Sequence, residues 1–357
     1  MTRTTHRFAV SVAALVIGSV GLSACGANDA AGGGGGEGGD AATIAFFLPE
    51  TQNARYETFD RPIFEAKVEE LCADCEVLYF NADQDKDAQA EQVDSAITQG
   101  ADVLVLDPVD GEAISASVAD AQSQDIPVIA YDRFIDGADY YMSFDNEQVG
   151  RLQGEALVEA VGDTGRILMV NGSPDDANAG QFKAGAHSVI DESGLEVVAE
   201  YDTVQWEPGN AQQFVTDTIA KVGADTIDGV YAANDGTAGG AIAALTGAGV
   251  APADLPPVTG QDAELAAVQR IVAGEQFMTV YKSIKTEAEK AAEVAVALAQ
   301  GEEVSDTEDF QGVPSFIFDP VVVTQDNVQL LVDEGFWSVE DICTPEYADA
   351  CAEIGLS

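Results

Sequence analysis

Basic residues are scarce in this sequence of 357 residues. It contains 15 Lys and Arg against 63 Asp and Glu, which gives a formal net charge of −48 at pH 7. Such a chain repels the phosphates of nucleic acids and the headgroups of anionic membranes at every approach. The composition therefore excludes nucleic acid as a partner. Most of the carboxylates are expected to form a solvated acidic surface.

Residues that bind transition metals are also few. The sequence has two histidines, His6 and His187, and five cysteines. The letters CADC at 72–75 have a spacing that is also found in zinc and redox sites. This pair follows an expected helix, however, and it has no second Cys or His pair nearby. We therefore expect no metal site, and no cofactor.

The N-terminus carries an apolar run at residues 8–22 that is too short for a stable membrane span. Because Arg3 and Arg7 precede it, residues 1–24 are interpreted as a removable export signal. The letters LSACG resemble the bacterial lipobox, in which Cys25 is lipidated, although an ordinary signal with a coincidental cysteine is an alternative. Residues 25–42 are then the lipidated Cys and a flexible Gly-rich linker. Without residues 1–24, 13 bases remain against 63 acids, a net charge of −50.

Four cysteines remain once Cys25 is assigned to the anchor. In an oxidising compartment an even number predicts disulfides, and four cysteines permit three pairings. Local spacing favours Cys72–Cys75 and Cys343–Cys351.

From residue 43 onward, short β-branched and apolar runs alternate with segments of helical periodicity. The expected strands are 43–48, 76–81, 102–106, 127–131, 166–171, 196–201, 228–232, 257–260 and 277–281. The expected helices are 57–71, 86–99, 112–124, 146–161, 179–192, 209–222, 237–248, 263–273 and 285–300. Such alternation predicts an α/β fold with parallel sheets and helices on both faces. The number of strands favours two successive units, the first from 43 to about 145 and the second from about 146 to 280. An apolar strand-like run at 316–323 and a helix at 326–333 follow.

Polar side chains gather where the expected strands end, which is where ligands bind in open parallel sheets. Three of the scarce basic residues, Arg55, Arg133 and Lys282, fall in loops at this edge. A single polar residue there often only caps a helix, and buried ion pairs with Asp132 and Asp262 are a second structural explanation. The whole collection is better explained by a polar ligand.

The collection suits a sugar. Sugar hydroxyls need paired donors and acceptors, and the C–H groups of the ring pack on aromatic faces. Tyr56 and Trp206 can sandwich such a ring. The side chains expected to bind hydroxyl groups are those of Asp132, Arg133, Asn178, Asn234 and Asp262.

Four blocks of the sequence carry a resemblance to a known family. They are AYDRFIDGADYYMSFDNEQVGRLQGEALV (130–158), GSPDDANAGQFKAG (172–185), ANDGTAGGAIAAL (233–245) and GQDAELAAVQRIVAGEQFMTVYKSI (260–284). In these blocks the chain resembles the pentose-binding branch of the periplasmic sugar-binding proteins of ABC transporters, above all the bacterial D-xylose-binding proteins. The similarity extends, more weakly, over about 43 to 335.

This resemblance implies two Rossmann-like lobes that are joined by a three-strand hinge and close over one monosaccharide. The implied division assigns 43–145 plus 282–315 to an N-terminal lobe, 146–281 plus 316–342 to a C-terminal lobe, and 343–357 to a tail. The residues that match the family's ligand-binding positions are Arg55, Tyr56, Asp132, Arg133, Asn178, Trp206, Asn234, Asp262 and Lys282. The sequence departs from the family at Ala177, where an asparagine is frequent, and at Tyr56, where tryptophan is common.

The function that follows is the binding component of an ABC sugar importer. It would be a monomeric, extracytoplasmic lipoprotein on the cell membrane that binds D-xylose and delivers it, unaltered, to permease subunits. The alternatives are another aldose (glucose, arabinose or ribose) or a sugar sensor for a chemoreceptor or kinase. A glycosidase that uses Asp132 and Asp262 is not expected, because Arg133 and Lys282 should keep both carboxylates ionised. A sugar-responsive repressor would need a DNA-binding segment and a basic face.

Overall fold

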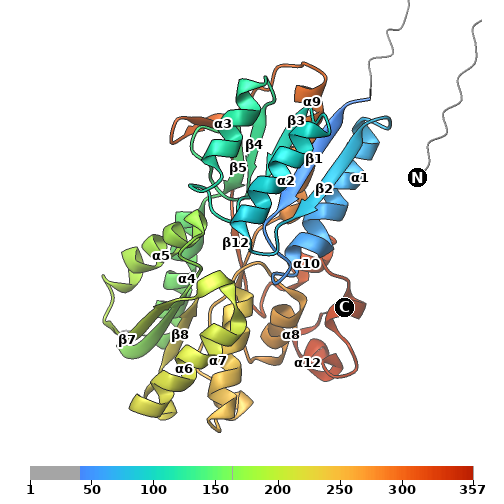
Figure 1. Ribbon diagram of the computed structural model, residues 1–357. Helices are drawn as coiled ribbons and strands as arrows, with labels where there is room; N and C mark the ends of the chain where they lie inside the picture. Colours follow the sequence, from blue (N-terminus) through green and yellow to red (C-terminus); the bar gives the residue numbers. More distant parts are fainter. Residues whose placement is uncertain (1–40, 163, 357) are drawn as a thin grey trace, which may run out of the picture. The chain divides into compact units, whose positions relative to one another are not determined.

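The computed structural model describes residues 41–162 and 164–356, and these residues belong to one compact unit. Cys25, the expected signal at 1–24 and nearly all of the 25–42 linker lie outside the described residues. The expected α/β class is confirmed, because strands and helices alternate from β1 onward in two lobes, each built on its own sheet (Figure 1).

The first lobe has a sheet in the order β10-β11-β5-β4-β3-β1-β2, parallel except for the hairpin between β10 and β11. Its strands are β1 (Thr43–Leu48), β2 (Glu76–Asn81), β3 (Val103–Leu106), β4 (Val128–Tyr131), β5 (Tyr140–Phe144), β10 (Glu308–Phe310) and β11 (Val313–Phe318). Helices α1 (Arg61–Leu71) and α9 (Ile284–Ala299) pack on the face that carries Phe46. Helices α2 (Lys86–Thr98) and α3 (Ser115–Ser123) cover the face of Phe47. Successive residues of β1 point to opposite faces of the sheet. Because both faces are buried, β1 is apolar throughout.

The second lobe has a parallel core in the order β7-β6-β8. The strands are β6 (Gly165–Asn171), β7 (Leu195–Asp202) and β8 (Gly229–Ala232). Helices α4 (Asn146–Val161) and α5 (Ala177–Ile190) pack on one face. Helices α6 (Pro208–Val222) and α7 (Asp235–Gly247) pack on the other. Single parallel bridges, Val230 to Val258 and Gln261 to Val280, continue the sheet toward β9 (Thr279–Tyr281), which pairs antiparallel with β12 (Val321–Val323).

A C-terminal segment packs beside α8 (Leu265–Ala273) of the second lobe. It contains α10 (Gln329–Asp333), α11 (Val339–Ile342) and α12 (Ala348–Ile354), whose apolar side chains share one buried cluster with α8. The expected disulfides are confirmed: Cys343–Cys351 lies in this segment, and Cys72–Cys75 follows α1. None of the described helices is both long enough and apolar enough to cross a membrane.

The chain passes between the two sheets at three places in the described residues: from β5 to α4, from β9 to α9, and from β11 to β12. The expected run at 316–323 is in fact two strands in different sheets, because Asp319-Pro320 interrupts it. Proline has no backbone N–H for a ladder and restricts the residue before it. The expected division, which assigned 316–342 to the second lobe, therefore cuts through β11. That strand pairs with β5 of the first sheet over Ser315–Phe318.

Candidate functional site

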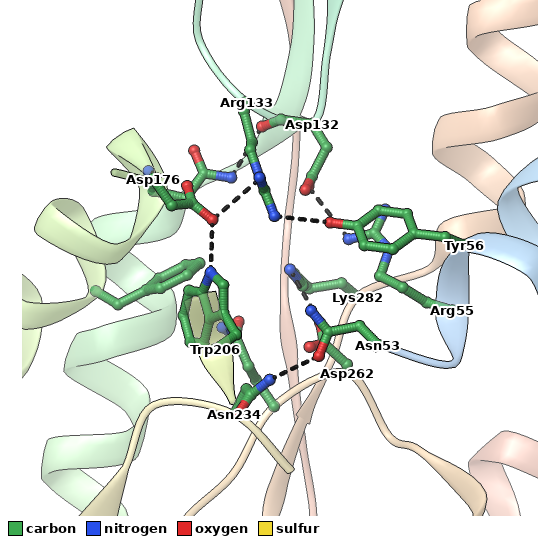
Figure 2. Close-up of a pocket in the computed structure, with 13 residues that line it drawn as sticks. Asn53, Arg55, Tyr56, Asp132, Arg133, Asp176, Trp206, Asn234, Asp262 and Lys282 are labelled. Carbon is green, nitrogen blue, oxygen red and sulfur yellow. Dashed lines mark hydrogen bonds and ion pairs between the residues drawn. The ribbon is translucent and has the colours of Figure 1, made fainter. Parts of the chain in front are cut away.

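All nine side chains singled out in the sequence line one cavity between the two lobes (Figure 2). It encloses about 280 Å³. Four further residues line it: Asn53, Asp176, Phe182 and Gln261. The structure thus brings the expected residues together, and their part in binding remains a prediction.

Arg55 stands at the centre of a buried ion-pair network in the first lobe. Its guanidinium donates twice to Asp60, from Nε at 3.1 Å and from Nη2 at 2.8 Å. Nη1 donates to Asp132 Oδ1 at 3.2 Å, and Nη2 to Glu287 Oε2 at 3.1 Å. The side chains of all four residues are at most 5% exposed. Burial opposes the charge on Arg55, but Asp132, Asp60 and Glu287 outweigh it and raise its pKa well above the usual value.

Two of the carboxyls that bind Arg55, those of Asp132 and Glu287, have pKa values shifted in opposite directions. Burial raises the pKa of Glu287 well above its usual value, and the nearby charge of Asp132 raises it further. Burial also opposes ionisation of Asp132, but Arg55, Lys282 and Arg133 together hold its pKa below the usual value. The surroundings therefore favour the ionised form of Asp132 in the cavity wall and oppose ionisation of Glu287.

Arg133 links the two lobes across the cavity. In the first lobe its Nη2 donates to Tyr56 Oη at 3.1 Å and its Nη1 to Pro108 O at 3.0 Å. Its Nε lies 3.0 Å from Asp176 Oδ2 in the second lobe and 3.4 Å from Asp107 Oδ1 in its own. Arg133 thus stands between two carboxylates on opposite sides of the cleft.

Asp176 was not expected at the site, although it contacts three of the expected residues. Besides Arg133, its Oδ2 accepts a hydrogen bond from Trp206 Nε1 at 3.0 Å. Its other oxygen accepts from Asn178 N at the start of α5, so that Asp176 is also an N-cap. An Asp shortly before an expected helix, here 179–192, is an ordinary capping signal, and capping alone does not point to a ligand site.

The aromatic groups come from both lobes. Figure 2 shows Tyr56 and Trp206 on opposite sides of the cavity. Phe182, on α5, meets Trp206 edge to face with ring centroids 6.4 Å apart. A Cβ atom on Gly172 would come within 2.1 Å of the Trp206 ring, so only glycine allows the indole to lie there.

Two amide side chains also donate hydrogen bonds across the cleft. Asn178 Nδ2 donates to the backbone oxygen of Asp132 at 3.0 Å, and Asn234 Nδ2 donates to Asn53 Oδ1 at 3.1 Å. Asn234 also caps α7 through Thr237 N, so the capping explanation and the cavity position both apply to it. Within the described residues, Asn178 Oδ1 and Gln261 Oε1 are buried without a hydrogen-bond partner. Both can accept hydrogen bonds from a ligand.

Lys282 and Asp262 meet at a crossing between the lobes, where Lys282 Nζ lies 3.1 Å from Asp262 Oδ1. Burial opposes the charge on Lys282, but Asp262 and Asp132 outweigh it and raise its pKa. The backbones of Asp262, Asp132 and Trp206 have φ values of 90°, 58° and 55°. Residues other than glycine are uncommon in this region, and each costs of order 1–3 kcal/mol. Three of the cavity side chains therefore depend on turns that the surrounding structure must hold.

The site can form many hydrogen bonds but offers no arrangement for metal chemistry. In residues 41–162 and 164–356, no group of three or more His, Cys, Asp or Glu side chains is placed to hold a metal ion. The cavity combines ionised groups that are already paired, amides with free acceptors, and flat apolar rings. Such a set fits an uncharged ligand with hydroxyl groups on a ring.

Comparisons with known proteins favour a ligand of the same kind. A family model described as "Periplasmic binding protein domain" matches residues 44–303. The D-xylose-binding periplasmic protein of Haemophilus influenzae is 39% identical over 294 residues, which cover 79% of this chain and 87% of that protein. The protein of the same name from Escherichia coli is 40% identical over 288 residues, which cover 78% and 86%. A solved ABC transporter solute-binding protein from Clostridium phytofermentans, with bound β-D-glucose, is 30% identical. It matches with a TM-score of 0.75 over 84% of this chain and 99% of that one.

Proposed function

The chain belongs to the periplasmic binding protein domain family, and we propose that it is the sugar-binding component of an ABC importer, with D-xylose as its ligand. The observation that supports this most directly is the cavity itself, in which two lobes bring Arg133, Asp262 and two facing rings around a space of about 280 Å³. The side chains around it suit one monosaccharide. The names of the two relatives favour D-xylose among the candidates.

A neutral ligand is favoured over an anionic one because each basic group of the cavity already has a carboxylate partner. Arg55 has Asp60 and Asp132, Arg133 has Asp107 and Asp176, and Lys282 has Asp262. An anionic ligand would have to separate one of these buried cations from its carboxylate partner, which is costly in a desolvated site. A sugar adds hydroxyl groups that can bond to charged partners without disturbing this balance, each worth roughly 1.5–3 kcal/mol.

Binding is proposed to proceed by closure of the two lobes around the sugar. Bonds that run directly from one lobe to the other, such as Asn234 to Asn53, close the cleft. The few residues at the three crossings would absorb the motion, as hinges do in periplasmic binding proteins, which are the standard example of this movement. The closed form would then be recognised by the permease subunits.

The finer parts of the proposal concern location and chemistry. Cys25 would be lipidated and would hold a monomeric protein at the outer face of the cell membrane. The sugar would leave unaltered, since the low pKa of Asp132 keeps that carboxyl from acting as a general acid. A release assay with nitrophenyl pentosides tests the last point, and turnover above buffer would favour an enzyme.

Calorimetric titration with xylose, arabinose, ribose and glucose tests the ligand. We expect the tightest binding with D-xylose. Glucose is the second candidate, because the solved relative from Clostridium phytofermentans holds β-D-glucose. Tightest binding of glucose would overturn the assignment to xylose, and no heat with any of the four sugars would contradict the function.

A further inference from the structure

Four aromatic side chains outside the cavity connect both lobes with the C-terminal segment. Phe59 belongs to the π-helix η1 (Tyr56–Asp60) of the first lobe, and Tyr281 ends β9 at a crossing. Phe336 and Trp337 follow α10. Phe59 stacks on Phe336 with ring centroids 4.2 Å apart and meets Trp337 edge to face at 4.9 Å. Tyr281 lies 5.0 Å from Phe336. We call these four residues the aromatic cluster.

The C-terminal segment is fastened to the second lobe, so that its contact with Phe59 runs between the lobes. Gln269 of α8 donates to Asp341 O at 3.0 Å. The Cys343–Cys351 disulfide closes the segment on itself, and α11 and α12 pack on α8. This segment lies beyond residues 44–303, the part that the family model matches.

Each end of the cluster reaches an element that carries cavity residues. On the first-lobe side, Phe59 shares η1 with Tyr56, and Arg55 is the residue just before that helix. On the second-lobe side, Trp337 Nε1 donates to Ala263 O at 2.8 Å. Ala263 follows Asp262, and both residues have positive φ, 49° and 90°. A turn of two such residues needs outside support, and the indole N–H supplies a bond to it.

We propose that Trp337 is a positioning residue for ligand binding and that the aromatic cluster fastens the closed cleft. Trp337 holds the turn that aims Asp262 into the cavity. Through Phe59 it also holds η1, which carries Tyr56, in the matching place on the other lobe. Contacts that exist only when the lobes are in this arrangement favour it over others, and they raise affinity without touching the ligand. The effect on affinity rests on the proposed sugar binding, whereas the link between the lobes does not.

The test compares Trp337→Phe with the wild type. Phenylalanine keeps the packing against Phe59 but loses the N–H donor. Because one hydrogen bond to a buried group is lost, we expect the Kd for D-xylose to rise about fivefold at 25 °C. Thermal unfolding without sugar should change little. Phe277→Leu is the control, since Phe277 belongs to the same lobe but to neither the cluster nor the cavity lining. Its Kd should equal that of the wild type.

A second measurement separates this inference from the proposed function. Hydrogen exchange is followed, without sugar, in peptides that cover 54–60 and 261–265. In Trp337→Ala, which removes both the ring that Phe59 contacts and the N–H that bonds to Ala263 O, we expect faster exchange in both peptides, although they belong to different lobes. Unchanged exchange at 54–60 would overturn the link between lobes, whatever the protein binds. If the wild type binds sugar and Trp337→Phe has an unchanged Kd, the positioning role of Trp337 is overturned. A wild type that binds none of the four aldoses would contradict the proposed function and leave the exchange result to decide on the cluster.

Discussion

The two lobes build their walls of the cavity in different ways. In the first lobe the charged groups bind one another: Arg55 takes all of its partners, Asp60, Asp132 and Glu287, from its own lobe. In the second lobe the amides of Asn178 and Asn234 donate across the cleft instead. The first wall can therefore exist before closure, whereas the second is complete only when the lobes meet. Preformed polar groups lose little freedom on binding, and this favours initial docking on the first lobe.

The largest effect is expected from a change in the wall of the first lobe. Arg133→Ala removes a partner of Asp107 and Asp176, both of which are buried. We expect binding of D-xylose to weaken by at least about 2 kcal/mol, as loss of a buried charged partner should. Calorimetry measures this, with Arg166→Ala as control, because Arg166 is partly exposed and lies outside the cavity lining. Affinity within error of the wild type would show that Arg133 does not bind the ligand.

A smaller effect is expected from the aromatic side of the second lobe. Trp206→Leu removes a flat ring and the N–H that bonds to Asp176. Ring contacts of this kind contribute roughly 0.5–1.5 kcal/mol, so the Kd should rise about tenfold. Trp206→Phe keeps a ring and should lie between the two. If Trp206→Leu weakened binding more than Arg133→Ala, the order of importance of the two walls would be reversed.

Each hydrogen bond across the cleft is expected to contribute to ligand affinity about as much as one ordinary hydrogen bond. Asn53→Ala removes the acceptor for Asn234 and also the Nδ2 donor to the buried Glu50 Oε1, at 2.7 Å. The expected loss of affinity is about 1 kcal/mol, with a small fall in the sugar-free Tm. Asn234→Ala removes the same bond together with the N-cap of α7, so it should lower both affinity and Tm. Equal Tm values for the two variants would contradict this separation.

The smallest effect is expected from two aspartates of one loop, Asp107 and Asp110, whose contributions to stability change with pH in opposite directions. Burial raises the pKa of Asp107 well above its usual value, although Arg133 opposes this. Its contribution to stability is therefore full below the unfolded pKa of about 3.9 and is lost as the pH rises. Asp110 is the reverse case. Burial opposes ionisation there, but backbone and Lys86 hydrogen bonds lower its pKa, so its contribution is lost as the pH falls.

Thermal unfolding of Asp107→Asn and Asp110→Asn at pH 4 and pH 7 tests this contrast. Relative to the wild type, Asp107→Asn should gain Tm between pH 4 and pH 7, and Asp110→Asn should lose it. A change of the same sign in both variants would mean that burial of Asp107 does not control its protonation.

The sequence predicted the part of the site that depends on strand ends. Arg133 is the second residue after β4 and Asn234 the second after β8, and parallel topology brings such positions to one edge. Asp176 and Phe182 were missed because they belong to the start and the inner face of α5, where capping and core packing explain the same residue types. Asp60, Asp107 and Glu287 were missed because in an acidic chain nothing in the pattern separates a buried carboxylate from a solvated one.

The prediction of the fold succeeded where turn residues bound an apolar run, and it failed where a strand depends on tertiary pairing. Strands β1 and β2 match the expected 43–48 and 76–81 because turn residues bound an apolar run. Strand β5, with the letters YYMSF, was missed because α4 begins one residue after Asp145 and leaves no loop between them. Pairing with β4 and β11 creates this strand, and that pairing is a tertiary effect.

The positive φ values of Asp132, Trp206 and Asp262 bear on any attempt to retarget this protein to another ligand. At these three positions most substitutions would be strained by the backbone conformation, β-branched residues above all. Asn178 and Phe182, which project from α5, carry no such restriction. Engineers should therefore randomise the helix-borne pair first and leave the three turns as found.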